Sequence, residues 1–216
     1  MLAFAAITWP WLLRSLWGGK RADKTALLAR LDLPPDALPK LGGWRADVRF
    51  LTRLVDLIET QRPAVVVELG GGTTSLVMAA ALARGGTGRL VSYEAHLEFA
   101  EETRASLLAH GLHAEIVHSP LTENGDGPTR WYALSDVPAA IDLLVVDGPP
   151  WTVHPQVRGA AERLFSRVSP GGIVLLDDAA RPGERLVARR WRRDWPQFAW
   201  RYEPLIKGLL TGVRQR

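Results

Sequence analysis

The chain has 216 residues, of which 47% are hydrophobic and 23% are charged, as in an ordinary globular domain with a full core. It contains no cysteine, which excludes disulfide bonds, thiolate zinc sites and cysteine nucleophiles. The net charge is +4, and residues 181–216 hold ten arginines or lysines against three acids. Such a segment suits nucleic acid, an anionic lipid or an acidic substrate, or it is a solvated helix face beside an edge hairpin. We favour the solvated face.

Residues 1–40 are predicted to form an N-terminal extension ahead of one domain at 41–216. Met1 to Leu13 is almost wholly apolar, and Arg14, Lys20 and Arg21 follow it. The apolar run is too short to span a bilayer, which takes roughly 20 residues, and it lacks the basic start and cleavage site of a signal peptide. Residues 1–20 therefore either touch a membrane surface peripherally or pack on the domain or on a second subunit, as in a homo-oligomer. We favour packing, and a cytoplasmic protein.

Helical periodicity predicts helices at 24–31 and 47–60, and after them apolar runs alternate with helical segments. The strands are expected at 64–68, 89–94, 113–118, 141–147, 172–177, 198–202 and 208–213, and the helices at 74–84, 97–110, 155–168 and 183–193. A loop with a helical turn is expected to run to residue 138. The alternation predicts an α/β fold: a doubly wound, Rossmann-like, seven-stranded and mostly parallel sheet that ends in an antiparallel hairpin.

A glycine-rich turn follows the first of these strands. The run Ala64–Val67 is apolar, Glu68 comes next, and Gly70, Gly71 and Gly72 precede the helix. Glycines let the backbone turn sharply and approach a bulky ligand, and the helix N-terminus behind them offers free N–H groups. Glu94 ends the next strand, where a carboxylate can accept both hydroxyls of a ribose. The pattern therefore predicts a nucleoside site.

Two classes of nucleoside fit this pattern. A dinucleotide site requires a third glycine where this chain has Ser75, and a pyrophosphate would be repelled by Glu68. The sulfonium and amino group of S-adenosylmethionine (SAM) suit an acid. The run Glu68-x-Gly-x-Gly-x-Thr74, with Glu94 later, resembles the class I SAM-dependent methyltransferases. That resemblance implies a SAM site that includes Ser75, and Ser119 after the third strand as an adenine contact.

Acids also stand at the ends of two later strands. Asp147 follows one apolar run, and Asp177 and Asp178 follow the next. Because parallel strands end at the same sheet edge, these carboxylates are expected to converge, and three hard oxygen ligands suit Mg²⁺ or another divalent cation. Such a metal would bind a substrate hydroxyl as a Lewis acid. Alternatively, Asp147 faces the SAM sulfonium and Asp178 caps the helix that follows.

These acids resemble those of the cation-dependent O-methyltransferases of the catechol O-methyltransferase type. A closer likeness is to small bacterial class I methyltransferases, in the segments Trp131-Tyr132, Val146–Pro150, Arg158, Pro170–Gly172 and Asp177–Ala179. The catechol-type enzymes place a lysine base shortly after the first metal aspartate, and this chain has none there.

The candidate catalytic residues are therefore His154, Asp147 and Asp178. Arg158 is expected to bind an anionic substrate group or to pair with an acid on its own helix face. Trp131 and Tyr132 are expected to wall the substrate pocket or to pack in the core.

The predicted function is SAM-dependent methyl transfer to a hydroxyl of a small molecule or glycan. One alternative is an NAD(P)-dependent oxidoreductase, which Ser75 and Glu68 disfavour. The other is a non-catalytic binding protein that keeps the SAM fold. Nucleic acid is not an expected acceptor, because the chain carries no Asn-Pro-Pro-Tyr base-flipping signature.

Overall fold

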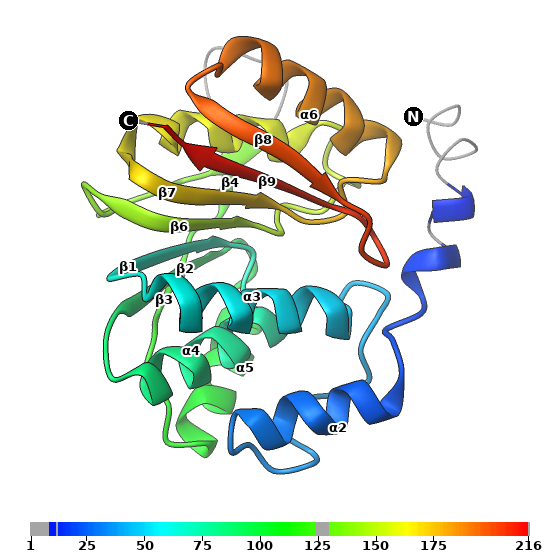
Figure 1. The fold of residues 1–216 in the computed structure, drawn as a ribbon, viewed down its shortest axis with the longest axis vertical. Helices are drawn as coiled ribbons and strands as arrows, with labels where there is room; N and C mark the ends of the chain where they lie inside the picture. The colour runs from blue at the N-terminus through cyan, green and yellow to red at the C-terminus, as the bar shows by residue number, and fades with distance from the viewer. Residues whose placement is uncertain (1–8, 12, 124–129, 216) are drawn as a thin grey trace.

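The computed structural model describes residues 9–11, 13–123 and 130–215, which form a seven-stranded sheet with helices on both faces (Figure 1). The strands of the sheet are β1 (Val65–Leu69), β2 (Arg89–Glu94), β3 (Glu115–His118), β6 (Ile141–Val146), β7 (Val168–Leu176), β8 (Phe198–Glu203) and β9 (Leu209–Arg214). The helices are α2 (Arg21–Arg30), α3 (Val48–Gln61), α4 (Thr73–Gly85), α5 (Leu97–Ala109) and α6 (Pro182–Asp194), with the 3-10 helix η1 (Val157–Arg167).

The strands lie in the order β3-β2-β1-β6-β7-β9-β8. The first five in this order are parallel, and β9 pairs antiparallel with both β7 and β8. The predicted doubly wound sheet with an antiparallel C-terminal hairpin is thus confirmed. The chain moves outward from β1 to β3 and then crosses back to β6, so the winding reverses between β1 and β6. Ligands of open α/β sheets bind at such a reversal, outside the carboxyl ends of the strands.

The central strands are apolar on both sides because each face of the sheet is covered by helices. One core lies under α2, α3, α4 and α5 and takes Val66, Leu143 and Leu175 from the strands. The other core lies under η1 and α6 and takes the alternate residues, among them Val67 and Leu144. This two-sided burial explains why the strands read as unbroken runs of valine, leucine and isoleucine.

The second half of the N-terminal extension packs on the domain. Leu27 and Leu28 of α2 are buried in the same core as α3, and Arg30 forms ion pairs with Asp56 and Glu59 of α3. Helix α3 begins where the carboxylate of Asp47 accepts hydrogen bonds from two backbone N–H groups of its first turn. An N-cap of this kind stabilises a helix start that would otherwise leave donors unpaired.

Two segments differ from the prediction. The expected α-helix at 155–168 is the tighter 3-10 helix η1, and part of the expected loop to residue 138 pairs as the short strands β4 (Leu121–Glu123) and β5 (Arg130–Tyr132). Three-residue strands give too few alternating positions for a sequence pattern to reveal. In the described ranges, no helix has both the length and the apolar character needed to cross a bilayer.

Candidate functional site

The glycine turn after β1 is fixed by close backbone packing. Gly70 has a φ of 92°, and a Cβ there would lie 2.7 Å from the backbone nitrogen of Gly148, which follows β6. No L-residue fits both the conformation and the space. The Gly70 N–H donates to the carbonyl of Tyr93 at 2.9 Å. The turn is therefore held between the strands on either side of it.

Glu94 reaches the same turn from the end of β2. Its Oε2 accepts a hydrogen bond from the Gly71 N–H at 3.0 Å, and its Oε1 accepts one from the His96 N–H at 2.9 Å. Burial raises the pKa of this carboxyl, although these backbone bonds oppose the shift. Glu94, the residue predicted to bind the ribose, is thus in direct contact with the glycine turn.

Glu68 is buried beside the first turn of α4. Its side chain is fully buried, and its Oε2 accepts hydrogen bonds from the hydroxyls of Ser75 and Ser92, the latter at 2.6 Å. Burial raises the pKa of Glu68 to about 7, against the opposing hydrogen bond from Ser75. Glu68 thus braces the start of α4 against β2, and its predicted contact with SAM stays a prediction.

The first turn of α4 completes this part of the site. The Ser75 hydroxyl also accepts from the Gly72 N–H at 3.0 Å, and both Thr74 and Ser75 are buried. The serine in place of a third glycine therefore has a structural role in closing the turn.

Ser119 stands at the end of β3 beside these elements. Its N–H donates to the carbonyl of Glu94 at 2.7 Å, and its hydroxyl is buried without a hydrogen-bond partner among the described residues. A buried hydroxyl of this kind is costly unless a ligand or water satisfies it. The position suits the predicted adenine contact, which stays a prediction.

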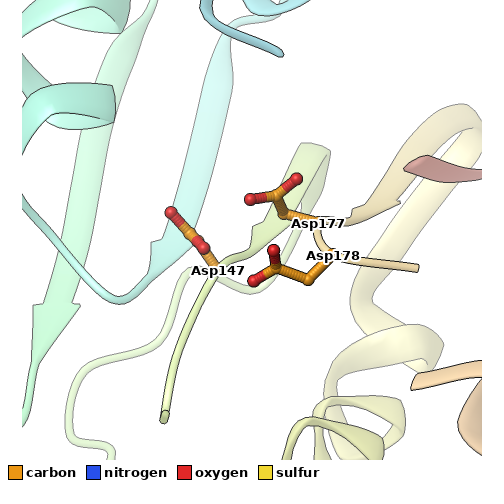
Figure 2. A group of neighbouring side chains, drawn as sticks. All are labelled: Asp147, Asp177 and Asp178. Carbon is orange, nitrogen blue, oxygen red and sulfur yellow. The ribbon is translucent and has the colours of Figure 1, made fainter. Parts of the chain in front are cut away.

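The three aspartates predicted to converge do so. Asp147 follows β6, Asp177 and Asp178 follow β7, and one carboxylate oxygen from each lies within 4.8 Å of the others (Figure 2). Asp177 and Asp178 are almost fully buried, whereas the Asp147 side chain is 16% exposed. Asp147 is therefore the member of the group that an acceptor can most readily reach.

Buried cations already pair with these carboxylates. Arg158 of η1 donates to Asp178 Oδ2 at 3.0 Å and to Asp147 Oδ1 at 3.3 Å. Arg181 lies 2.8 Å from Asp178 Oδ2, and the Lys207 ammonium lies 3.9 Å from Asp178 Oδ1. The acids that Arg158 pairs with thus lie at two strand ends and not on its own helix, and its contact with a substrate stays a prediction.

The charges set the protonation of the group. Burial acts to raise the pKa of Asp178, but Arg181, Lys207 and Arg158 outweigh it and hold that pKa below its usual value. Burial, and then the neighbouring carboxylates Asp178 and Asp147, raise the pKa of Asp177 well above its usual value. The group therefore places three carboxyls with different proton affinities beside three cations, Arg158, Arg181 and Lys207.

This arrangement does not fit the predicted divalent metal. The three carboxylates have the right chemistry for Mg²⁺, but Arg158 already occupies one oxygen of Asp147 and one of Asp178. An ion placed between them would have to displace a buried, hydrogen-bonded cation.

Other predicted roles concern His154, the cap of α6 and two aromatic residues. The His154 Nδ1 accepts a hydrogen bond from the Gln156 N–H at 3.2 Å, and no bond from His154 to the three aspartates occurs among the described residues. Asp178 does not cap α6, whose N-cap is Arg181 without a side-chain bond. Trp131 and Tyr132 are buried in the core, as one alternative expected, and their place in a substrate pocket stays a prediction.

The sequence pattern does not indicate the burial of Arg181, Lys207 or Glu184. Arg181 and Glu184 read as part of the basic, solvated helix, and Lys207 lies in the turn between β8 and β9. Burial, opposed by Arg158 and Arg181, raises the pKa of Glu184 to about 7. No local pattern distinguishes these residues from surface charges, because their partners lie far away in the sequence.

A family model described as a methyltransferase domain matches residues 67–179, more than half of the chain. The chain belongs to this methyltransferase family. No curated protein matches the chain at a significant level. The family assignment confirms the predicted methyltransferase and leaves the oxidoreductase alternative without support.

Solved structures share the fold at low sequence identity. An O-methyltransferase from Bacillus cereus in complex with SAH has a TM-score of 0.62 and 16% identity, with 99% of each chain covered. The O-methyltransferase TomG from Streptomyces achromogenes, solved with SAM, has a TM-score of 0.58 and 16% identity, covering 100% of this chain and 95% of its own. The SAH-bound methyltransferase PaMTH1 from Podospora anserina has a TM-score of 0.61 and 14% identity, covering 90% and 88%. These likenesses confirm the predicted methyltransferase fold.

Proposed function

We propose that this methyltransferase uses SAM to methylate a hydroxyl group of a small molecule or glycan. The observation that carries the proposal is the contact between Glu94 and the Gly71 N–H, which joins the ribose-binding acid to the glycine turn at the sheet's reversal point. Gly70, Gly72 and Thr74, which are predicted to contact the cofactor, belong to the same turn and helix start, and the Ser119 N–H donates to the carbonyl of Glu94. The names of the similar O-methyltransferases favour oxygen as the acceptor atom.

Bound SAM would supply an electrophilic methyl group for in-line displacement by the acceptor oxygen. The chain's part is to hold the two reactants in line and to receive the hydroxyl proton. Asp147 is the first candidate for the proton acceptor, because Arg158 fixes one of its oxygens while the side chain stays partly exposed. His154 is the second candidate. Asp178, which is buried and paired with cations, is a positioning residue.

Calorimetric titration with SAM, SAH and NAD tests the cofactor. We expect SAM and SAH to bind and NAD not to bind. Glu94→Ala should weaken SAM binding by about tenfold or more, because a buried acceptor of two hydroxyl hydrogen bonds contributes over 1.4 kcal/mol. Glu115→Ala is the matched control, because Glu115 is exposed on the neighbouring strand β3. Unchanged affinity in Glu94→Ala would remove the ribose assignment.

Turnover separates the enzyme from a non-catalytic SAM binder. A panel of hydroxylated acceptors is incubated with SAM, and SAH release is measured for the wild type, Asp147→Asn and His154→Gln. Loss of turnover with retained SAM binding identifies the base. SAM binding without SAH release for any acceptor would favour the binding-protein alternative.

A further inference from the structure

A buried guanidinium joins the ends of β6 and β7. Arg158 is 5% exposed and donates to the carbonyls of Pro149 and Asp177 as well as to the carboxylates of Asp147 and Asp178. Its partners therefore come from both strand ends, and each partner is an oxygen. A divalent cation bound at these strand ends would gather the same kind of ligand.

A metal at these strand ends would meet three buried cations as well as the three aspartates. Arg181 and Lys207 contact the same carboxylate of Asp178 that Arg158 binds. Buried charges of this kind persist only when they are paired and hydrogen-bonded. A divalent cation added beside three intact cations would be repelled by all of them.

We propose that Arg158 stands in place of a divalent cation in this chain, so that its methyl transfer is independent of metal. Arg158 then acts as a positioning residue that holds Asp147 beside the acceptor. The inference concerns the ion pairs themselves and does not depend on the identity of the acceptor.

The wild-type chain gives the first test. Mn²⁺ is titrated into the protein, with and without SAH, and bound ion is followed by electron paramagnetic resonance. We expect no stoichiometric binding up to about 1 mM, the weak end of the range for protein Ca²⁺ sites. We also expect the same turnover in EDTA as in Mg²⁺. One bound Mn²⁺ per chain would overturn the proposal, whether or not SAM binds.

Removing the guanidinium gives the second test. Arg158→Gln keeps a donor but leaves the carboxylates without their central cation, so Mn²⁺ should now bind and should raise the thermal midpoint of the variant. Arg190→Gln, which removes an arginine paired with Glu162 on the same helix pair, is the control and should gain no Mn²⁺ response. If Arg158→Gln does not fold, Arg158→Lys retains the charge and should fold without binding Mn²⁺. A folded Arg158→Gln variant that does not bind Mn²⁺ and gains no thermal midpoint from it would contradict the proposal.

A second, independent observation concerns the N-terminal end. Trp9, Leu13, Leu16 and Trp17 are 52 to 63% exposed, and their spacing of four, three and one residues places them on one side of a helical segment. Trp44 is 72% exposed, on a loop whose Gly43 N–H donates to the carbonyl of Ser15 at 2.8 Å. We call these five side chains the N-terminal apolar face.

Basic residues accompany this face. Arg14, Lys20, Arg21 and Arg45 are exposed, and residues 1–22 contain no acid. Exposed tryptophans flanked by basic residues match the interface of an anionic bilayer, where indole rings lie at the headgroup level and cations meet lipid phosphates. If two copies of the chain paired through this face, the basic residues of one copy would lie against those of the other and repel them.

The face is connected to the site. Lys207, whose ammonium lies 3.9 Å from Asp178, also donates to the carbonyl of Arg45 at 2.8 Å. From this surface we infer that the N-terminal apolar face docks the chain on an anionic lipid bilayer.

Co-sedimentation with vesicles tests the inference. Binding is expected to mixed phosphatidylcholine–phosphatidylglycerol vesicles and to weaken with salt, with little binding to pure phosphatidylcholine. Trp9→Ser combined with Trp17→Ser should abolish it, whereas Phe99→Ser combined with Leu108→Ser, which changes exposed apolar residues of α5, should not. No vesicle binding would overturn the inference, as would a dimer in solution that the Trp9 and Trp17 substitutions dissociate.

Discussion

Gly70 shows how one residue type decides the geometry of the site. Its positive φ and the backbone of Gly148 beside it leave no room for a side chain. The turn can therefore bring Glu94 and the strand ends together only while this position is glycine. The same atoms that would hold a nucleoside also hold β1 against β6.

Substituting Gly70 should damage both stability and binding. In Gly70→Ala, a Cβ in the left-handed region and in contact with the Gly148 backbone should cost about 1–3 kcal/mol or more of unfolding free energy. Gly85→Ala, at the end of α4 with nothing near its Cβ, is the control and should be neutral or slightly stabilising. Urea unfolding measures the stability of the two variants. Equal stabilities would show that the turn relaxes without cost.

At the scale of elements, an aromatic cluster holds η1, α6 and β8 together. The ring of Phe165 lies 4.8 to 5.8 Å from the rings of Trp191, Trp195, Phe198 and Trp200. Because η1 is a 3-10 helix with poorer hydrogen-bond geometry than an α-helix, its position depends on this packing. The cluster therefore keeps Arg158, also on η1, at the strand ends.

Removing the central ring should loosen that face of the sheet. Phe165→Ala is expected to cost about 3–5 kcal/mol of unfolding free energy, as for other buried phenylalanines. Phe99→Ala, at a side chain that is 52% exposed, should change it by less than about 0.5 kcal/mol. Chemical denaturation followed by tryptophan fluorescence compares the two, and similar losses would contradict the packing argument.

For the whole molecule, buried acids couple stability to pH. The pKa values of Glu68 and Glu184 rise from 4.5 to about 7 on folding. Between these values the unfolded chain loses a proton that the folded chain keeps, so each group's contribution to stability is present below pH 4.5 and is lost as the pH rises to 7.

Glu68→Gln should remove this dependence at one site. The amide oxygen can still accept from Ser75 and Ser92, but it never becomes charged. Relative to the wild type, the variant should gain up to about 3 kcal/mol between pH 5 and pH 8. Urea midpoints at the two pH values measure the gain, with Glu115→Gln on the surface as the control. A constant difference at both pH values would mean that Glu68 stays charged.

Local patterns in the sequence determined the fold and the grouping of residues at the sheet edge. The apolar strands predicted the sheet and its winding. The glycine turn and the acids at the strand ends predicted that Glu94 lies at the turn and that the three aspartates converge. Each of these depends on residues close in sequence or on the rule that parallel strands end at one edge.

The tertiary structure alone decided what surrounds those acids. It turned Glu68 inward onto two serines, and it placed Arg158, Arg181 and Lys207 against Asp147 and Asp178. An isolated arginine or lysine in a sequence looks the same whether it faces solvent or a carboxylate. Only the packing of η1, α6 and the β8–β9 turn on the sheet edge fixes which charges are buried together, and therefore whether the aspartates face a metal or a guanidinium.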